Sequence, residues 1–252
     1  MENWFGNIMT EPFQAFSISH IIMLGLYILG IILFISFFQQ IKNHKGINEV
    51  LRWSLFTLLL LSEISYQTWA VVNGVWNTVE HLPLHLCGIA SILGMLALMT
   101  KNQKLVQITF FIGIIPAMLA LVTPELPHAF PHYRFMKFFI HHMIISWTGI
   151  YLVSIYMNRR VTFKHVLETF GYLNVYALLM AAVNGALGSN YLYLNQTPEA
   201  TTPLSFFGSG FIYFINLEIA ACFLFTLQWS VYRAITNKKS NLEIQHEWNY
   251  EK

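Results

Sequence analysis

The sequence contains no aspartate, only two cysteines and few charged residues of any kind. Asp, Glu, Lys and Arg make up 10% of the 252 residues, against about 25% in an ordinary soluble domain. Two cysteines cannot build the disulfide framework of a small secreted protein. The 14 basic and 12 acidic residues nearly balance, so the charge gives no indication of nucleic-acid binding.

The first 13 residues lack positive charge: they contain Glu2 and Glu11 but no Lys or Arg. A cleavable signal peptide begins with a basic segment. We therefore expect the first apolar helix to be retained in the mature protein.

Apolar residues are in excess: they make up 56% of the chain, and the mean hydropathy is +0.52. A helix needs about 20 mostly apolar residues to cross a hydrocarbon layer of about 30 Å. Seven stretches qualify, and they predict an all-α fold, a seven-transmembrane-helix bundle that forms a single transmembrane domain over residues 1–252. Their approximate limits are 18–38, 53–73, 83–100, 105–122, 136–157, 165–187 and 208–233.

The positions of Lys and Arg predict the orientation of this bundle. All but two of the 14 basic residues fall on one side of a seven-helix threading. Because cytoplasmic loops are enriched in Lys and Arg, we expect a multi-pass protein of the cell membrane with its N-terminus outside and its C-terminus in the cytoplasm. The exceptions, Arg134 and Lys137, lie together around the start of the fifth stretch, where Arg134 suits a phosphate or carboxylate headgroup.

Four of the apolar stretches carry one polar residue near the outer end of a face of small residues. These polar residues are Glu63, Cys87, His142 and Asn184. Small residues mark close helix packing, and polar side chains in a membrane usually face the bundle interior or a watery cavity. We therefore predict a polar pocket that opens outward, although small-residue faces also occur where helices merely pack.

Cys87 and His142 lie at a similar depth, roughly 6–9 Å inside the outer ends of their stretches at about 1.5 Å per residue. A thiol beside an imidazole forms a nucleophile and base pair that can hold an acyl group as a thioester. Glu63, Asn184 or Asn216 could orient the imidazole. The alternative is that Cys87 is a small buried hydrophobe and His142 a histidine hydrogen-bonded within the bundle.

A metal site is the rival interpretation. His81 and His85 have the i, i+4 spacing of ligands on one helical face, and His141 or His142 could complete a zinc site. However, Cys87 lies about 200° around a helix from His85, and the sequence lacks the Asp that membrane hydrolases resembling alkaline ceramidases combine with His. We therefore predict no metal and no cofactor.

Two outer segments supply further candidates for substrate binding. Residues 123–135 contain three prolines, which make the segment stiff, and residues 188–198 contain tyrosines that suit the membrane interface. The full set of candidate substrate-binding or orienting residues is Arg134, His85, His132, Glu63, Gln67, Asn184, Asn190 and Tyr191.

Three strings lie in order between the apolar stretches: HLPLHLCG (81–88), FPHYRFMKFFIHH (130–142) and NYLYLNQTP (190–198). Together they resemble the YwaF-like family of bacterial integral membrane proteins. That family is similar to the eukaryotic transmembrane protein 164 group and, distantly, to the androgen-induced and androgen-dependent lipid hydrolases. The resemblance implies lipid acyl-transfer or hydrolase chemistry, with the family's Cys at Cys87 and its His at His142 or the neighbouring His141.

The leading hypothesis is a membrane-embedded lipid acyltransferase or hydrolase that uses a Cys–His pair in an outward-facing pocket, with a membrane lipid as its partner and no nucleic acid. One alternative is a non-enzymatic sensor or transporter that binds a small molecule there. A third is a metal-dependent membrane hydrolase. The sequence leaves open whether the protein is an enzyme, which groups donate and accept the acyl chain, and the oligomeric state.

Overall fold

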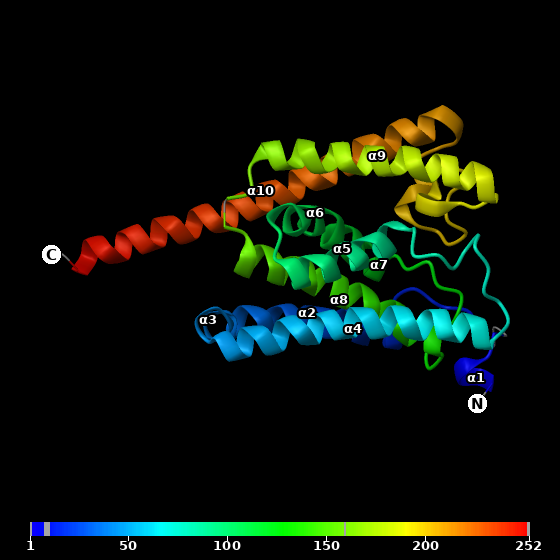
Figure 1. Ribbon diagram of the computed structural model, residues 1–252, viewed down its shortest axis with the longest axis horizontal. Coiled ribbons are helices and arrows are strands. Elements are labelled where there is room, and N and C mark those ends of the chain that lie inside the picture. Colours follow the sequence, from blue (N-terminus) through cyan, green and yellow to red (C-terminus); the bar gives the residue numbers. More distant parts are fainter. Residues whose placement is uncertain (1, 8–10, 159, 251–252) are drawn as a thin grey trace.

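The computed structural model describes residues 2–7, 11–158 and 160–250, and these residues are all helical or irregular (Figure 1). They contain no β-strand, only an isolated bridge between Pro12 and His128. The all-α prediction is therefore confirmed. The helices are α1 (Glu2–Phe5), α2 (Ile18–Ser36), α3 (Phe38–Asn43), α4 (Lys45–Val72), α5 (Leu86–Thr100), α6 (Gln103–Gly113), α7 (Ile115–Val122), α8 (Tyr133–Tyr156), α9 (Phe163–Leu187) and α10 (Gly210–Tyr250), with short 3-10 turns at Tyr191–Tyr193 and Pro203–Phe206.

Each of the seven predicted stretches holds a helix, but only six are long and apolar enough to cross a membrane in the described part of the chain. The six are α2, α4, the segment Gln103–Val122 that combines α6 and α7, α8, α9 and the first part of α10. The exception is α5, which has 15 residues and so spans only about 22 Å. The third stretch was predicted to begin at residue 83, but residues 73–85 form turns and bends.

A proline divides the fourth predicted helix, 105–122, into α6 and α7. Pro116 is in the first turn of α7, and Ile114 is the residue between the two helices. Proline has no backbone N–H and its ring clashes with the preceding turn, so an uninterrupted helix cannot run through this position.

The helices form three layers, with α8 in the middle one (Figure 1). Helix α8 packs against α2, α4, α5, α6 and α7, and its side chains Phe135, Phe139, Ile144 and Leu152 are fully or almost fully buried. The outer helices α2, α4, α9 and α10 expose many large apolar side chains instead. Such faces suit contact with lipid, as expected for a membrane protein.

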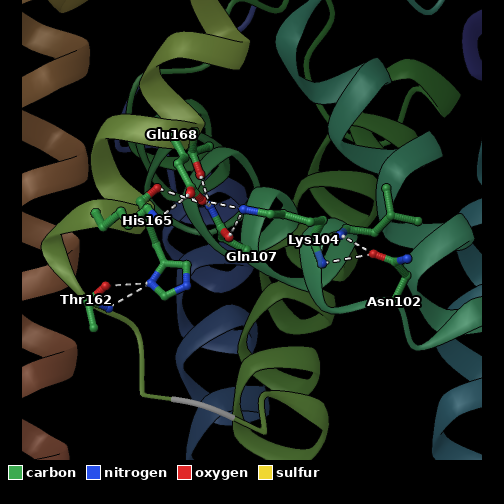
Figure 2. Close-up of polar contacts among 9 residues, drawn as sticks. Asn102, Lys104, Gln107, Thr162, His165 and Glu168 are labelled. Carbon is green, nitrogen blue, oxygen red and sulfur yellow. Dashed lines mark hydrogen bonds and ion pairs between the residues drawn. The ribbon is translucent and has the colours of Figure 1, made fainter.

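A polar cluster joins α6 to α9 where both helices begin (Figure 2). Gln107 Nε2 donates hydrogen bonds to the His165 carbonyl oxygen at 3.2 Å and to Thr169 Oγ1 at 3.1 Å. Lys104 forms an ion pair with Glu168. These bonds fix one end of the bundle.

Candidate functional site

A cavity of about 480 Å³ lies at the other end of the bundle, where α4, α7 and α9 end and α5, α8 and α10 begin. Six of the residues singled out from the sequence line it, from three different helices and the turn before α5: Glu63, His81, His85, Cys87, His141 and His142. The fold therefore brings the predicted nucleophile and both candidate bases to one cavity.

Cys87 lies in the first turn of α5. Its thiol is free and its side chain is partly exposed. The other cysteine, Cys222, is on α10 and does not line the cavity. Cys87 is thus the cysteine in a position to meet a ligand there.

His142 is held in one orientation by its own helix. Its Nδ1 lies 2.7 Å from the Phe138 carbonyl oxygen, and because a carbonyl oxygen only accepts, Nδ1 must donate. In the neutral ring the proton is then on Nδ1, and Nε2 carries a lone pair. Nε2 makes no hydrogen bond within the described part of the chain, so it is free to accept a proton from a group in the cavity.

His141 lines the same cavity, although its position on a helical wheel differs from that of His142 by about 100°. The ring centroids of the two histidines are 6.0 Å apart and the rings are nearly perpendicular. The Nδ1 atom of His141 is buried and has no hydrogen-bond partner among the described residues. His141 therefore lacks the carbonyl bond that fixes the tautomer of His142.

Glu63 faces the cavity and is joined to the turn before α5 through Gln67. Gln67 Nε2 donates to Glu63 Oε1 at 2.8 Å and to the His81 carbonyl oxygen at 2.7 Å, and its Oε1 accepts from Trp76 Nε1 at 2.8 Å. Gln67 itself is not a lining residue. Its amide holds the turn to α4 and bonds Glu63, so it can orient Glu63 without touching a ligand in the cavity.

The polar residues predicted near the end of α9 form a structural network instead of lining the cavity. Asn184 Oδ1 accepts from Ser189 Oγ and from the Tyr191 backbone N–H, both at 2.8 Å, and Asn184 Nδ2 donates to the Tyr191 carbonyl oxygen. Asn190 caps the following loop through the backbone N–H groups of Asn195 and Gln196. These amides have their partners within the chain, so they do not orient His142.

Tyr191 is also structural, because its ring is fully buried and its hydroxyl donates to the Thr78 carbonyl oxygen at 2.6 Å. His132 is the N-cap of α8: its Nδ1 accepts from the Arg134 backbone N–H at 3.1 Å, and its Nε2 donates to the Gly6 carbonyl oxygen at 2.9 Å. Neither residue lines the cavity.

Arg134 lies beside the cavity. Its guanidinium carbon is 5.5 Å from the centroid of the Tyr66 ring and 5.3 Å from that of Trp69. Tyr66 lines the cavity. Arg134 is therefore separated from the cavity by an aromatic ring, where its charge is stabilised by cation–π contacts.

Several polar lining residues were not among the candidates from the sequence, and they include Lys137, Glu218 and Tyr66. Lys137 had been noted only as a basic residue on the unexpected side of the membrane. Glu218 is the acidic residue of the last apolar stretch, and an ionisable side chain in a membrane segment is a functional candidate by default. No comparable signal identifies Tyr66.

Residues 188–209, which we call the lid, cover the cavity between α9 and α10. Lid residues that line it include Leu192, Tyr193, Leu194, Pro198, Thr202 and Phe207. Glu125 holds the lid, because its carboxylate accepts a hydrogen bond from the Tyr193 hydroxyl and one of 3.0 Å from the Glu199 backbone N–H. Burial raises the pKa of Glu125.

His85 packs against the lid, and this contact leads to a prediction about pH. Its ring centroid lies 5.2 Å from that of Tyr191 and 5.0 Å from that of Tyr193, and burial lowers its pKa to about 4. Because the folded-state pKa of His85 is below its usual value, the folded protein favours the neutral ring. The contribution of the neutral ring to folding stability is complete above about pH 6.5 and is lost as the pH falls toward 4. Thermal unfolding in detergent should show up to about 2 kcal/mol less stability at about pH 5 than at about pH 7.

The His85→Phe variant is the control for this prediction, since phenylalanine keeps the ring contacts and cannot be protonated. Its loss of stability on acidification should be smaller than that of the unmodified chain. An equal loss in both proteins would assign the effect to other groups.

The metal-site interpretation depended on His81 and His85 sharing a helical face, and that premise is wrong. Both residues precede α5, and His85 is its N-cap in an extended conformation. Within the described ranges no group of three or more His, Cys, Asp or Glu side chains is arranged to hold a metal ion.

Comparison with known proteins gives one relationship. The model of the TMEM164 family matches residues 15–229, which include the whole cavity and the lid. Neither the comparison with curated proteins nor that with solved structures gave a match.

Proposed function

Because the chain belongs to the TMEM164 family of membrane proteins, we propose that it is a lipid acyltransferase or hydrolase with Cys87 as nucleophile and His142 as general base. The observation that carries this proposal is the shared cavity: Cys87 and His142 both line it, and the Nδ1 bond of His142 leaves Nε2 available to accept a proton. The remaining walls are mostly apolar, as a lipid requires.

The proposed reaction has two acyl-transfer steps. His142 Nε2 accepts the thiol proton of Cys87, and the thiolate attacks the carbonyl carbon of a lipid ester. The C–O bond of the ester breaks, the leaving alcohol takes the proton from His142, and a thioester remains on Cys87. An acceptor alcohol or water then attacks the thioester while His142 accepts its proton, and the thiolate leaves and regains that proton.

The direct test is detection of the thioester. Protein purified from membranes and incubated with phospholipid should gain the mass of an acyl chain, and neutral hydroxylamine should remove it. Cys87→Ala should abolish the adduct, whereas Cys222→Ala, which alters a cysteine outside the cavity, should retain it. A sensor or transporter would form no adduct in any of these proteins, and an adduct that survives in Cys87→Ala would identify a different nucleophile.

We further propose that α5 is the seventh membrane span and that the cavity end of the bundle faces the outside of the cell. Helices α4 and α5 run side by side in opposite directions, because Arg52 of α4 donates to the Leu98 carbonyl oxygen of α5 at 2.8 Å while Glu63 and Cys87 share the cavity at the other end. Helix α5 thus returns the chain from one end of the bundle to the other, and the Lys- and Arg-rich end is the cytoplasmic one.

Reporter fusions test this topology. Fusions after Lys45 and Lys101 should report a cytoplasmic location, because both residues lie at the basic end. Fusions near Gly74 and Asn195 should report an external one. The opposite result at all four sites would reverse the orientation. An external signal at Lys101 and a cytoplasmic one at Asn195, with Lys45 and Gly74 as expected, would show that α5 does not cross the membrane.

A further inference from the structure

We propose that Lys137 is the residue that binds the phosphate group of the lipid, and that this contact makes the cavity selective for phosphate-bearing lipids over neutral acylglycerols. The inference deepens the proposed function, since it names the group that recognises the substrate of the same cavity. It concerns binding alone, so it can be tested in a protein that does not turn over.

Lys137 occupies the α8 wall of the cavity, which also carries His141 and the candidate base His142. It lies on α8 four residues before His141, so the two side chains share a helical face, and both line the cavity together with Cys87. The Nζ atom of Lys137 is 4.4 Å from the centroid of the Tyr66 ring. The ammonium group is therefore fixed close to the predicted site of acyl transfer.

Among the described residues, the ammonium group of Lys137 forms no ion pair within 4.0 Å. The carboxylate of Glu63 lines the same cavity and attracts Lys137 through space, but its hydrogen bond comes from Gln67. Nζ donates no hydrogen bond to any described side chain or carbonyl group. A cation in an apolar cavity is costly unless an anion accompanies it, so its N–H donors are available to a ligand.

A second cation adds to the positive potential at this end of the cavity. The guanidinium carbon of Arg134 lies 5.5 Å from the centroid of the Tyr66 ring that Lys137 also contacts. Two cations that share one ring repel each other, and an anion bound to Lys137 would reduce that repulsion. The positive charge of Lys137 and Arg134 is thus concentrated at one edge of the cavity, formed by α4 and α8.

The walls formed by α7, α9 and α10 are mostly apolar, with Glu218 of α10 as their ionisable side chain, which gives the cavity the two-part character of a phospholipid. Leu119 of α7, Leu173 and Ala177 of α9, and Leu217 and Leu224 of α10 line it away from Lys137. A lipid phosphate placed at Lys137 would leave its acyl chain against these side chains. Between the two regions the ester carbonyl would lie beside Cys87.

The test measures lipid binding by native mass spectrometry in a Cys87→Ala background, where no acyl transfer is expected. The ligands are dioleoyl phosphatidylglycerol, dioleoylglycerol and oleic acid. Lys137→Met keeps the length of the side chain and removes the charge, and it should weaken phosphatidylglycerol binding by roughly tenfold to a hundredfold, the usual effect of a charge-assisted hydrogen bond. Dioleoylglycerol binding should not change, and Lys137→Arg should retain most of the phosphatidylglycerol binding.

Two controls make the result decisive. Lys164→Met removes a lysine that is highly exposed at the other end of the bundle and should leave all three ligands unaffected. Lys137→Gln provides a second neutral variant if the methionine variant unfolds in detergent. Unchanged phosphatidylglycerol binding in the neutral variants, or equal losses for the phospholipid and dioleoylglycerol, would overturn the proposal. A larger loss for oleic acid than for phosphatidylglycerol would assign Lys137 to a carboxylate instead.

The binding result and the catalytic result are independent. Selective phospholipid binding through Lys137 without a thioester on Cys87 would refute the proposed reaction and retain the binding site. A thioester on Cys87 without any effect of the Lys137 variants on binding would retain the proposed reaction and refute the binding site.

Discussion

Cys87→Ala, His142→Ala and the double variant are all expected to reduce acyl transfer to the same residual level. General-base catalysis contributes about 10²-fold to 10⁴-fold to a reaction, so losses of about 10³-fold are expected for the single variants. Removing either member abolishes the same thiolate attack, so the second substitution should cost little further activity. The measurement is transfer of a labelled acyl chain in proteoliposomes, with the three variants compared at equal protein content.

Packing variants would behave differently. If Cys87 and His142 only filled space, their effects would add, and thermal stability would fall with activity. Cys87→Ser, which is close in volume, would then be nearly silent. Full activity of the Cys87→Ala variant would rule out Cys87 as the nucleophile, whatever the thermal stability of that variant.

His141→Ala provides the matched control for His142→Ala, because the two histidines are adjacent and both line the cavity. His141→Ala should retain most activity, since only His142 has the Phe138 bond that leaves Nε2 as the proton acceptor. An essential His141 together with a dispensable His142 would exchange their roles and show that the bond to Phe138 is purely structural.

The apolar length of the stretches predicted where helices lie, because a segment in lipid must satisfy its own backbone groups. The stretch 18–38 contains α2, Ile18–Ser36, and the stretch 165–187 lies within α9, Phe163–Leu187. Small-residue faces also identified which helix sides meet: Cys87 and His142 come from different helices and line one cavity. These features depend on local composition and helical periodicity, which the sequence displays directly.

The features that the sequence did not predict depend on turns and on contacts between distant segments. The i, i+4 spacing of His81 and His85 indicates a shared face only within a helix, and residues 73–85 form turns and bends. Asn184 has the same polar character as a substrate-binding amide, but the backbone of Tyr191 folds back onto it. The tyrosines of residues 188–198 marked that segment as a candidate for substrate binding, but no periodic pattern marks residues 199–209 as part of a cavity wall.

Gly88 is the residue next to Cys87, and Gly88→Ala is the substitution that should disturb the cavity most without changing a chemical group. A Cβ at this position would lie 2.5 Å from the Pro83 carbonyl oxygen, 2.7 Å from its carbonyl carbon and 2.8 Å from its Cα. All three contacts are with backbone atoms, which cannot rotate away as a side chain can. The turn that carries His85 must therefore move away from the first turn of α5, or Cys87 must move with that turn.

Overpacking of this kind typically costs about 1–3 kcal/mol, so Gly88→Ala should lower thermal stability in detergent. It should also remove most thioester formation, because the thiol would leave its place in the cavity that it shares with His142. Gly171→Ala is the matched control: Gly171 lies on α9 with nothing within 4 Å of its added Cβ, and alanine in an exposed helix is favoured over glycine by up to about 1 kcal/mol. Its stability should be equal or higher, with unchanged activity. The Gly88→Ala protein could instead prove as stable and as active as the Gly171→Ala protein. The turn at Pro83 would then yield without displacing Cys87, and the placement of the thiol would not depend on this close backbone contact.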